Sequence, residues 1–241
     1  QLGALSAAPA TAGELALERK LALDAARVRF ALAQQLAPHL PAARLAHAEA
    51  IAEEEPRAAV TALAELRTLA PLYEAERVAA LLGSLHARLG AYQEARAEYE
   101  RALSMHCSDG PPSALLIALA QIVMFQGDLP SALTLYERAL RDAEPNERIR
   151  AMWGRAVALD RAGDHAAALT TARRALAEDR FDALRTMTFV PAFEHSYYHA
   201  LRALAQGQPA QALVSFRQYL AADAGPFVAD AREHLAALDS K

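Results

Sequence analysis

Small, bulky and polar positions recur in the same order four times along the chain. Each copy starts at a glycine, has an alanine five positions later and a bulky residue nine positions later, and ends with a small residue followed by Leu. Two copies depart from the pattern, with Ala172 at a bulky position and Tyr219 at a small one. The copies begin at Gly90, Gly127, Gly163 and Gly207, which are 37, 36 and 44 residues apart. A period of this length predicts a stack of similar units.

The spacing within each copy predicts a helical hairpin. Glycine can end a helix in the left-handed conformation at little cost, and the next three or four residues then turn the chain into a second helix. Alanines at the fifth and twelfth positions allow two helix backbones to approach closely, and the bulky residue between them fills the remaining space. Because one hairpin cannot bury its apolar side alone, we expect the hairpins to stack on one another.

The first complete copy resembles the tetratricopeptide repeat, in which a small residue lies in the middle of the first helix and a glycine occupies the turn. The matching residues are Leu82, Gly83, Gly90, Tyr92, Ala95, Tyr99 and Ala102. At the position of Gly83 the later copies have Ala120, Ala156 and Ala200. Weaker copies of the second helix occur earlier, at Ala59, Leu63, Leu66 and Pro71, and at Ala26, Phe30, Ala33 and Pro38. The resemblance covers roughly residues 20–222 and implies an all-α, right-handed superhelix of stacked hairpins, a TPR-like α-solenoid.

The sequence also predicts where this array begins and ends. We expect a flexible N-terminal segment at 1–11, a solenoid of about five hairpins plus an N-terminal helix at 12–225, and a C-terminal capping helix at 226–241. The apolar side of the last helix is formed by Phe227, Val228, Ala231, Leu235 and Leu238. A helix with one polar side suits the open end of a stacked array. An insertion at 181–195 makes the last spacing longer than the others.

Composition and charge exclude several classes of protein. Hydrophobic residues make up 54% of the chain and aromatic residues 6%, which suits a helical core and argues against an all-β fold or a disordered chain. The net charge of -4 argues against a nucleic-acid partner. The longest apolar run is shorter than the roughly 20 residues of a membrane-spanning helix, so we expect none. Only Lys20 and Lys241 are lysines, and this preference for arginine fits a GC-rich bacterial genome.

Sequence signatures of catalysis are missing, so we expect no enzyme activity and no cofactor. The chain has no phosphate-binding glycine-rich loop, no nucleophile elbow and no zinc-protease helix motif. The single cysteine, Cys107, follows His106 in a turn, and adjacent residues rarely form a nucleophile and its base.

One pair of histidines could bind a metal ion. His195 and His199 are four positions apart and would share one side of a helix, with Glu194 as the local third ligand. The alternative is that Phe189, Phe193, Tyr197 and Tyr198 pack the inserted segment against the last repeat, and that the histidines are partly exposed. We favour the packing alternative and expect no metal site.

A partner would bind on the concave surface, which in the resembling family is lined mainly by the first helix of each repeat. Trp, Tyr, Met and Arg are enriched at the centres of interfaces, and several of them occupy the lining positions. Trp153 is also a candidate for packing between repeats. The predicted partner-binding residues are Arg77, Ser84, Arg88, Gln121, Met124, Phe125, Arg150, Trp153, Asp160, Arg161 and Tyr197.

Two functions remain open from the sequence, beside a small metal-dependent enzyme, for which the only support is the pair His195 and His199. The first is a non-catalytic scaffold or adaptor, of bacterial origin, that binds a protein or peptide, as an extended peptide or an amphipathic helix, on its concave surface. The second is an accessory repeat region of a larger envelope assembly factor or transferase, suggested by the start at Gln1 and the linker-like residues after it. The compartment, cytoplasmic or periplasmic, and the oligomeric state stay undetermined by these patterns.

Overall fold

The computed structural model describes residues 12–37, 39–106, 112–180, 182–186, 190–191, 193–222 and 226–239. Over these residues the chain is helical and contains no strand, so the expected all-α fold is confirmed. The chain divides into two compact units, Gln1–Tyr73 and Glu74–Lys241. The predictions for residues 1–11, Cys107 and Phe189 lie outside the described residues.

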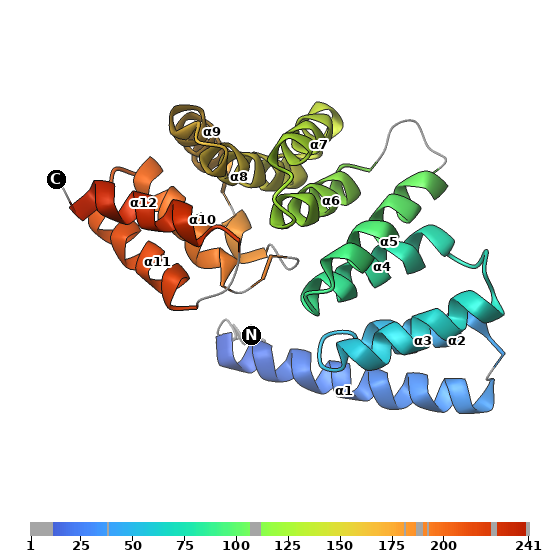
Figure 1. The fold of residues 1–241 in the computed structure, drawn as a ribbon. Coiled ribbons are helices and arrows are strands. Elements are labelled where there is room, and N and C mark those ends of the chain that lie inside the picture. Colours follow the sequence, from blue (N-terminus) through green and yellow to red (C-terminus); the bar gives the residue numbers. More distant parts are fainter. Residues whose placement is uncertain are drawn as a thin grey trace, which may run out of the picture. The chain divides into compact units, whose positions relative to one another are not determined.

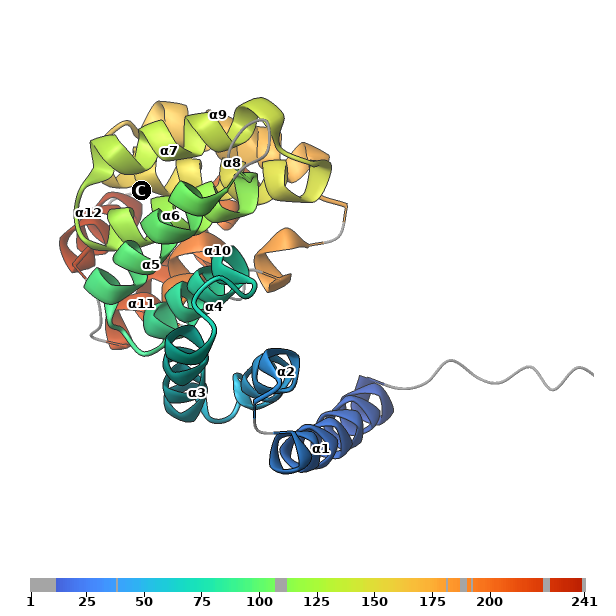
Figure 2. The same cartoon turned by 90° about the vertical axis from the view of Figure 1, so that its right-hand side faces the viewer.

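The described residues of the unit Gln1–Tyr73 form three helices. They are α1 (Ala12–Leu36), α2 (Pro41–Ile51) and α3 (Pro56–Leu69). Prolines at the first turns of α2 and α3 suit helix starts, where the missing N–H group has no partner to lose. Helix α1 packs against α2, and α2 packs against α3 (Figure 2). Ala59, Leu63 and Leu66 of α3 are fully buried, which fits the second-helix spacing found in the sequence.

The described residues of the unit Glu74–Lys241 form four helical hairpins followed by a single helix (Figure 1). The hairpins are α4 (Ala75–Arg88) with α5 (Tyr92–Met105), α6 (Ser113–Phe125) with α7 (Leu129–Asp142), α8 (Pro145–Arg161) with α9 (His165–Glu178), and α10 (Glu194–Ala205) with α11 (Pro209–Ala221). A short 3-10 helix, η1 (Ala183–Thr186), precedes α10, and α12 (Val228–Asp239) follows α11. The apolar pattern predicts that the final helix begins at Phe227, whereas α12 begins one residue later, at Val228.

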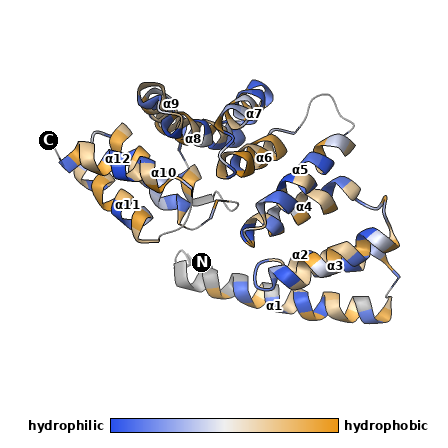
Figure 3. Cartoon of the chain, in the orientation of Figure 1, coloured by the Kyte–Doolittle hydropathy of each residue, from blue (hydrophilic) through white to orange (hydrophobic). Residues whose placement is uncertain are grey.

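Packing between the repeats of this unit uses both helices of each hairpin. The first helices α4, α6, α8 and α10 contact one another in succession, and each second helix contacts the first helix of the next repeat. The most apolar element, α6, is buried along nearly its whole length. It is mostly orange in Figure 3, the colour of hydrophobic residues. The alanines five and twelve positions after the turn glycines are buried, as expected; they are Ala95, Ala102, Ala132, Ala139, Ala168, Ala175 and Ala212.

The turns inside the hairpins have the predicted left-handed glycines. Gly127 has φ +85° and ends α6. Its N–H donates to the carbonyl of Met124 at 2.9 Å, and the N–H of Asp128 donates to the carbonyl of Val123 at 3.1 Å. These two bonds satisfy carbonyls that the end of the helix leaves without partners. Asp128 then caps α7, since its carboxylate accepts a hydrogen bond from the N–H of Ser131.

Two mid-helix glycines allow an aromatic ring to lie directly on the helix backbone. A Cβ added at Gly83 would lie 2.8 Å from the ring of Tyr99 in the same hairpin, which confirms the close packing expected there. A Cβ added at Gly154 of α8 would lie 2.4 Å from Cζ of Tyr136 in α7 of the preceding repeat. The second contact joins neighbouring repeats, and the sequence pattern did not identify it.

Among the described residues, no helix combines the length and the apolar character that crossing a membrane requires.

Candidate functional site

Most of the predicted partner-binding residues are buried. Here the inner face means the side of the unit Glu74–Lys241 formed by the first helices α4, α6, α8 and α10. Seven of the eleven predicted residues lie on this face with almost no solvent exposure, so their side chains offer no surface in this structure. The seven are Gln121, Met124, Phe125, Trp153, Asp160, Arg161 and Tyr197. Contrary to the expectation from the sequence, these seven side chains do not line an open groove. Contact of a partner with any of the eleven residues stays a prediction.

Side chains from later parts of the unit fill the inner face. Gln121 of α6 donates a hydrogen bond to the hydroxyl of Tyr198 in α10 at 2.9 Å, which spans the intervening repeat. Helix η1, from the inserted segment, packs against α8 and buries Leu184. Val190 of the same segment is buried as well. The insertion thus contributes to the core of the unit.

Trp153 belongs to this core. Its side chain is 0% exposed, and it is one of the largest fully buried side chains among the described residues. Arg150, one turn earlier on α8, is half-buried. The sequence left open whether Trp153 lines a binding surface or packs between repeats. In the structure its side chain packs in the core.

Arg161 and Glu194 form an ion pair in the interior. Nη2 of Arg161 lies 2.5 Å from Oε2 of Glu194, and both side chains are 0% exposed. Tyr219 donates a hydrogen bond to the other carboxylate oxygen at 3.3 Å, and the guanidinium lies 3.9 Å from the ring centre of Phe227. Burial alone would lower the pKa of Arg161, but the charge of Glu194 raises it. A buried pair of this kind fixes α8, α10 and α11 in one arrangement because neither charge tolerates losing its partner.

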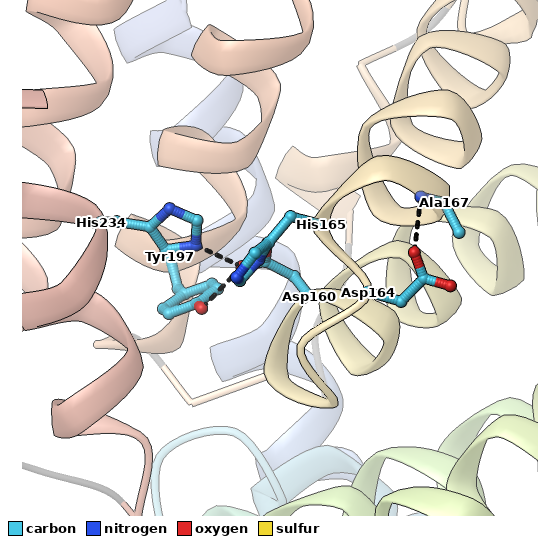
Figure 4. Close-up of polar contacts among 6 residues, drawn as sticks. All are labelled: Asp160, Asp164, His165, Ala167, Tyr197 and His234. Carbon is cyan, nitrogen blue, oxygen red and sulfur yellow. Dashed lines mark hydrogen bonds and ion pairs between the residues drawn. The ribbon is translucent and has the colours of Figure 1, made fainter. Parts of the chain in front are cut away.

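A second polar centre forms around the buried carboxylate of Asp160, at the end of α8. It accepts hydrogen bonds from Nδ1 of His165 at 2.8 Å, from the hydroxyl of Tyr197 at 2.7 Å and from Nε2 of His234 at 2.8 Å (Figure 4). Burial would raise the pKa of Asp160, but the hydrogen bonds and charge of its partners outweigh burial and lower it. The carboxylate is thus ionised at neutral pH.

Local structure explains how these side chains meet. Asp160 lies in the last turn of α8, and the tight glycine turn brings His165, the first residue of α9, back beside it. Asp164 caps α9 by accepting a hydrogen bond from the N–H of Ala167 at 3.0 Å (Figure 4). His234 comes from α12, 74 residues after Asp160. Asp160, His165 and His234 line a pocket of about 260 Å³. Its other walls are Leu169, Leu204, Glu233, Ala237 and Leu238.

The histidine pair that the sequence proposed as a metal site has a different environment. His195 and His199 lie on α10, and His199 lines a second pocket, of about 330 Å³, together with Arg202 and Gln206. Burial, the charge of His195 and the charge of Arg202 all lower the pKa of His199. A cationic neighbour opposes a bound metal ion, and the described part of the chain has no third ligand grouped with these two histidines.

One group of the predicted residues does lie on the surface. Arg77, Ser84 and Arg88 of α4, hereafter the α4 stripe, are exposed or half-exposed. Ser84 and Arg88 follow Arg77 by seven and eleven positions, which places all three residues on one side of the helix. The α4 stripe carries two cationic side chains at its ends.

Sequence patterns missed the grouping around Asp160, although they contained one signal. His234 lies between Ala231 and Leu238 on the apolar side of α12, where an aliphatic residue would be usual. A polar ring at such a position needs a buried partner, and that partner is Asp160.

Sequence models described as the tetratricopeptide repeat match residues 76–105 and 111–177. No curated protein matches the chain.

Several solved structures share the fold. YrrB, described as a TPR protein with an unusual peptide-binding site, is 16% identical with a TM-score of 0.52, over 85% of this chain and 96% of its own. MamA is 18% identical with a TM-score of 0.57, over 71% of this chain and 96% of its own. A tetratricopeptide repeat protein from Parabacteroides merdae is 16% identical with a TM-score of 0.58, over 92% and 79% of the two chains. Its matched repeats and stacked hairpins show that the chain contains tetratricopeptide repeats.

Proposed function

We propose that this protein is a non-catalytic scaffold that binds an acidic peptide or helix of a partner protein along the α4 stripe. The general part of the proposal follows from the family, because tetratricopeptide repeats serve as protein-interaction scaffolds. Among the proteins of similar fold, YrrB is described as having a peptide-binding site.

The observation that carries the finer proposal is the exposed α4 stripe. Arg77 and Arg88 are eleven residues apart, which corresponds to about 16 Å along a helix. An extended peptide covers this distance in about five residues. Two acidic side chains about five positions apart in an extended segment would therefore each reach one guanidinium, and Arg can bind a carboxylate through two hydrogen bonds.

Exposure separates this surface from the rest of the predicted site. The inner-face residues of α6, α8 and α10 are buried against one another, so a partner could reach them only if the repeats moved apart. The α4 stripe lies at the surface, with Arg77 and Arg88 exposed.

Peptide selection would test the proposal directly. Binders are selected from a displayed random-peptide library on the full chain, and the dissociation constant of each synthetic peptide is measured by fluorescence anisotropy. We compare the wild type with Arg77→Ala/Arg88→Ala and with the matched control Arg138→Ala/Arg141→Ala, which removes two exposed arginines from α7.

We expect selected peptides to contain paired acidic residues and to bind the α4 variant at least about tenfold more weakly, since each charged hydrogen bond contributes about 1.5–3 kcal/mol. The α7 variant should bind like the wild type. The proposal fails if no peptide is selected, if the α4 variant binds normally, or if both variants lose affinity equally.

A further inference from the structure

The groups that meet at Asp160 are ligand types for zinc and related ions. Nitrogen atoms of two imidazoles and an oxygen of one carboxylate, from His165, His234 and Asp160, all lie within 4.8 Å of one another. We propose that these three side chains bind a divalent transition-metal ion of the zinc type. Imidazole nitrogen is a preferred ligand of zinc, copper and nickel, whereas magnesium and calcium prefer all-oxygen sites.

The distances require only a small adjustment. Zinc binds nitrogen and oxygen at about 2.0–2.2 Å, so the ligand atoms of a tetrahedral ion lie about 3.3 Å apart. Each imidazole nitrogen is now 2.8 Å from a different oxygen of Asp160, and the two nitrogens are at most 4.8 Å apart. An ion bound to both nitrogens and to one of these oxygens would lengthen the 2.8 Å distance between that oxygen and its nearer nitrogen by about half an ångström.

Neighbouring side chains hold these ligands in place. The ring of His234 stacks on Phe216 with ring centres 4.7 Å apart and planes at 10°. Tyr197 donates to Oδ2 of Asp160 at 2.7 Å and is itself packed edge-on against Phe216. Metal ligands are commonly oriented by an outer hydrogen-bond partner of this kind, which fixes the direction of the carboxylate before the ion arrives.

The site is open on one side. All three ligands line the 260 Å³ pocket, and His165 is 45% exposed, so an ion can enter from solvent. Three protein ligands leave a fourth position, which a water molecule from the pocket can fill. Glu233, an exposed carboxylate on the same pocket wall, adds negative charge beside this position.

Local charge also favours a cation. Asp160 is ionised, and the nearest buried cation, Arg161, is paired with Glu194 and points its guanidinium at the rings of Tyr197 and Phe227. A bound ion would join the turn between α8 and α9 to α12, which are distant in sequence.

Metal titration of the full chain provides the test. The protein is stripped with EDTA, freed of the chelator, and titrated with Zn²⁺ or Co²⁺ in competition with a chromophoric chelator. Stoichiometry is measured by elemental analysis after gel filtration. The site variant is His165→Gln, which keeps a hydrogen-bond donor for Asp160 at a half-exposed position and should therefore fold. The control is His195→Gln/His199→Gln, and circular dichroism checks both variants.

We expect one Zn²⁺ per wild-type chain and strong visible absorption from four-coordinate Co²⁺. The affinity of His165→Gln should be lower by at least about 100-fold, because even an outer-shell partner contributes about 10–100-fold. The control should bind like the wild type, and Mg²⁺ and Ca²⁺ should not compete. The proposal is overturned if the wild type binds no stoichiometric zinc. The three side chains would then form hydrogen bonds to one another and no metal site. It is equally overturned if His165→Gln binds normally or if the control loses the metal.

Discussion

Gln121 in α6 and Tyr198 in α10 share a buried hydrogen bond of 2.9 Å although they are 77 residues apart in the chain. The bond joins the first helices of two repeats that have another repeat between them. It shows that the inner face of this unit is closed by its own side chains at this point. A groove that depends on these positions is absent from this conformation.

Replacing Tyr198 by Phe should destabilise the protein. The change removes the hydroxyl and leaves the buried amide of Gln121 without that acceptor, which costs about 1–3 kcal/mol in the free energy of unfolding. Urea denaturation followed by circular dichroism measures the loss. Tyr92→Phe, at a half-buried ring, is the control and should change stability by less than about 0.5 kcal/mol. Equal effects of the two changes would contradict the importance of the buried bond.

Truncating Trp153 should act on stability. Because the side chain is 0% exposed, Trp153→Ala leaves a large cavity and should cost about 3–5 kcal/mol of unfolding free energy. Arg150→Ala, one turn away at a half-buried position, should cost far less. Thermal unfolding of the two single variants separates them. A fully stable Trp153→Ala protein that has lost partner binding would instead favour a surface role for the indole.

Gly154→Ala should be destabilising although alanine is the better helix former by about 1 kcal/mol. The added methyl group would lie 2.4 Å from Cζ of Tyr136, so the ring or the helix has to move, at a cost of about 1–3 kcal/mol. The same change at Gly83, where the nearest ring atom is 2.8 Å away, should cost less. Chemical denaturation measures both.

A double variant tests the cause of this effect. In Gly154→Ala/Tyr136→Leu the smaller side chain relieves the clash, so the two changes should be less than additive. Additive losses would show that the ring is not what opposes the methyl group.

Alkaline pH should unfold the protein through its buried tyrosines. Burial is the main cause that raises the pKa of Tyr99, Tyr136, Tyr197, Tyr198 and Tyr219 above the ordinary value. In the unfolded chain these hydroxyls ionise near pH 10. Their contribution to stability is therefore fully present below pH 10 and is lost as the pH rises above it. Absorbance at 295 nm should show these tyrosines ionising together with the loss of helical circular dichroism, and ionisation before unfolding would contradict the prediction.

Local features of the fold follow from the sequence, whereas the closure of the inner face does not. Gly127 and the buried alanines have spacings that depend only on contacts within a hairpin, so a periodic pattern identifies them. The side of α8 that carries Trp153 is buried. What covers that side depends on η1, α10 and α12, which the chain adds much later. No short-range pattern connects Asp160 to His234, because 74 residues separate them and their contact depends on how α10, α11 and α12 pack on one another.

The contacts that skip a repeat also affect how the protein unfolds. In an array where each repeat touches only its neighbours, terminal repeats can unfold by themselves and transitions spread along the chain. Here Gln121 is bonded to Tyr198, and Asp160 to His234, across an intervening hairpin. Helix α12 cannot detach without uncovering the buried carboxylate of α8. We therefore expect α6 to α12 to unfold in one cooperative step, with similar hydrogen-exchange protection in the last helix and in the centre of the unit.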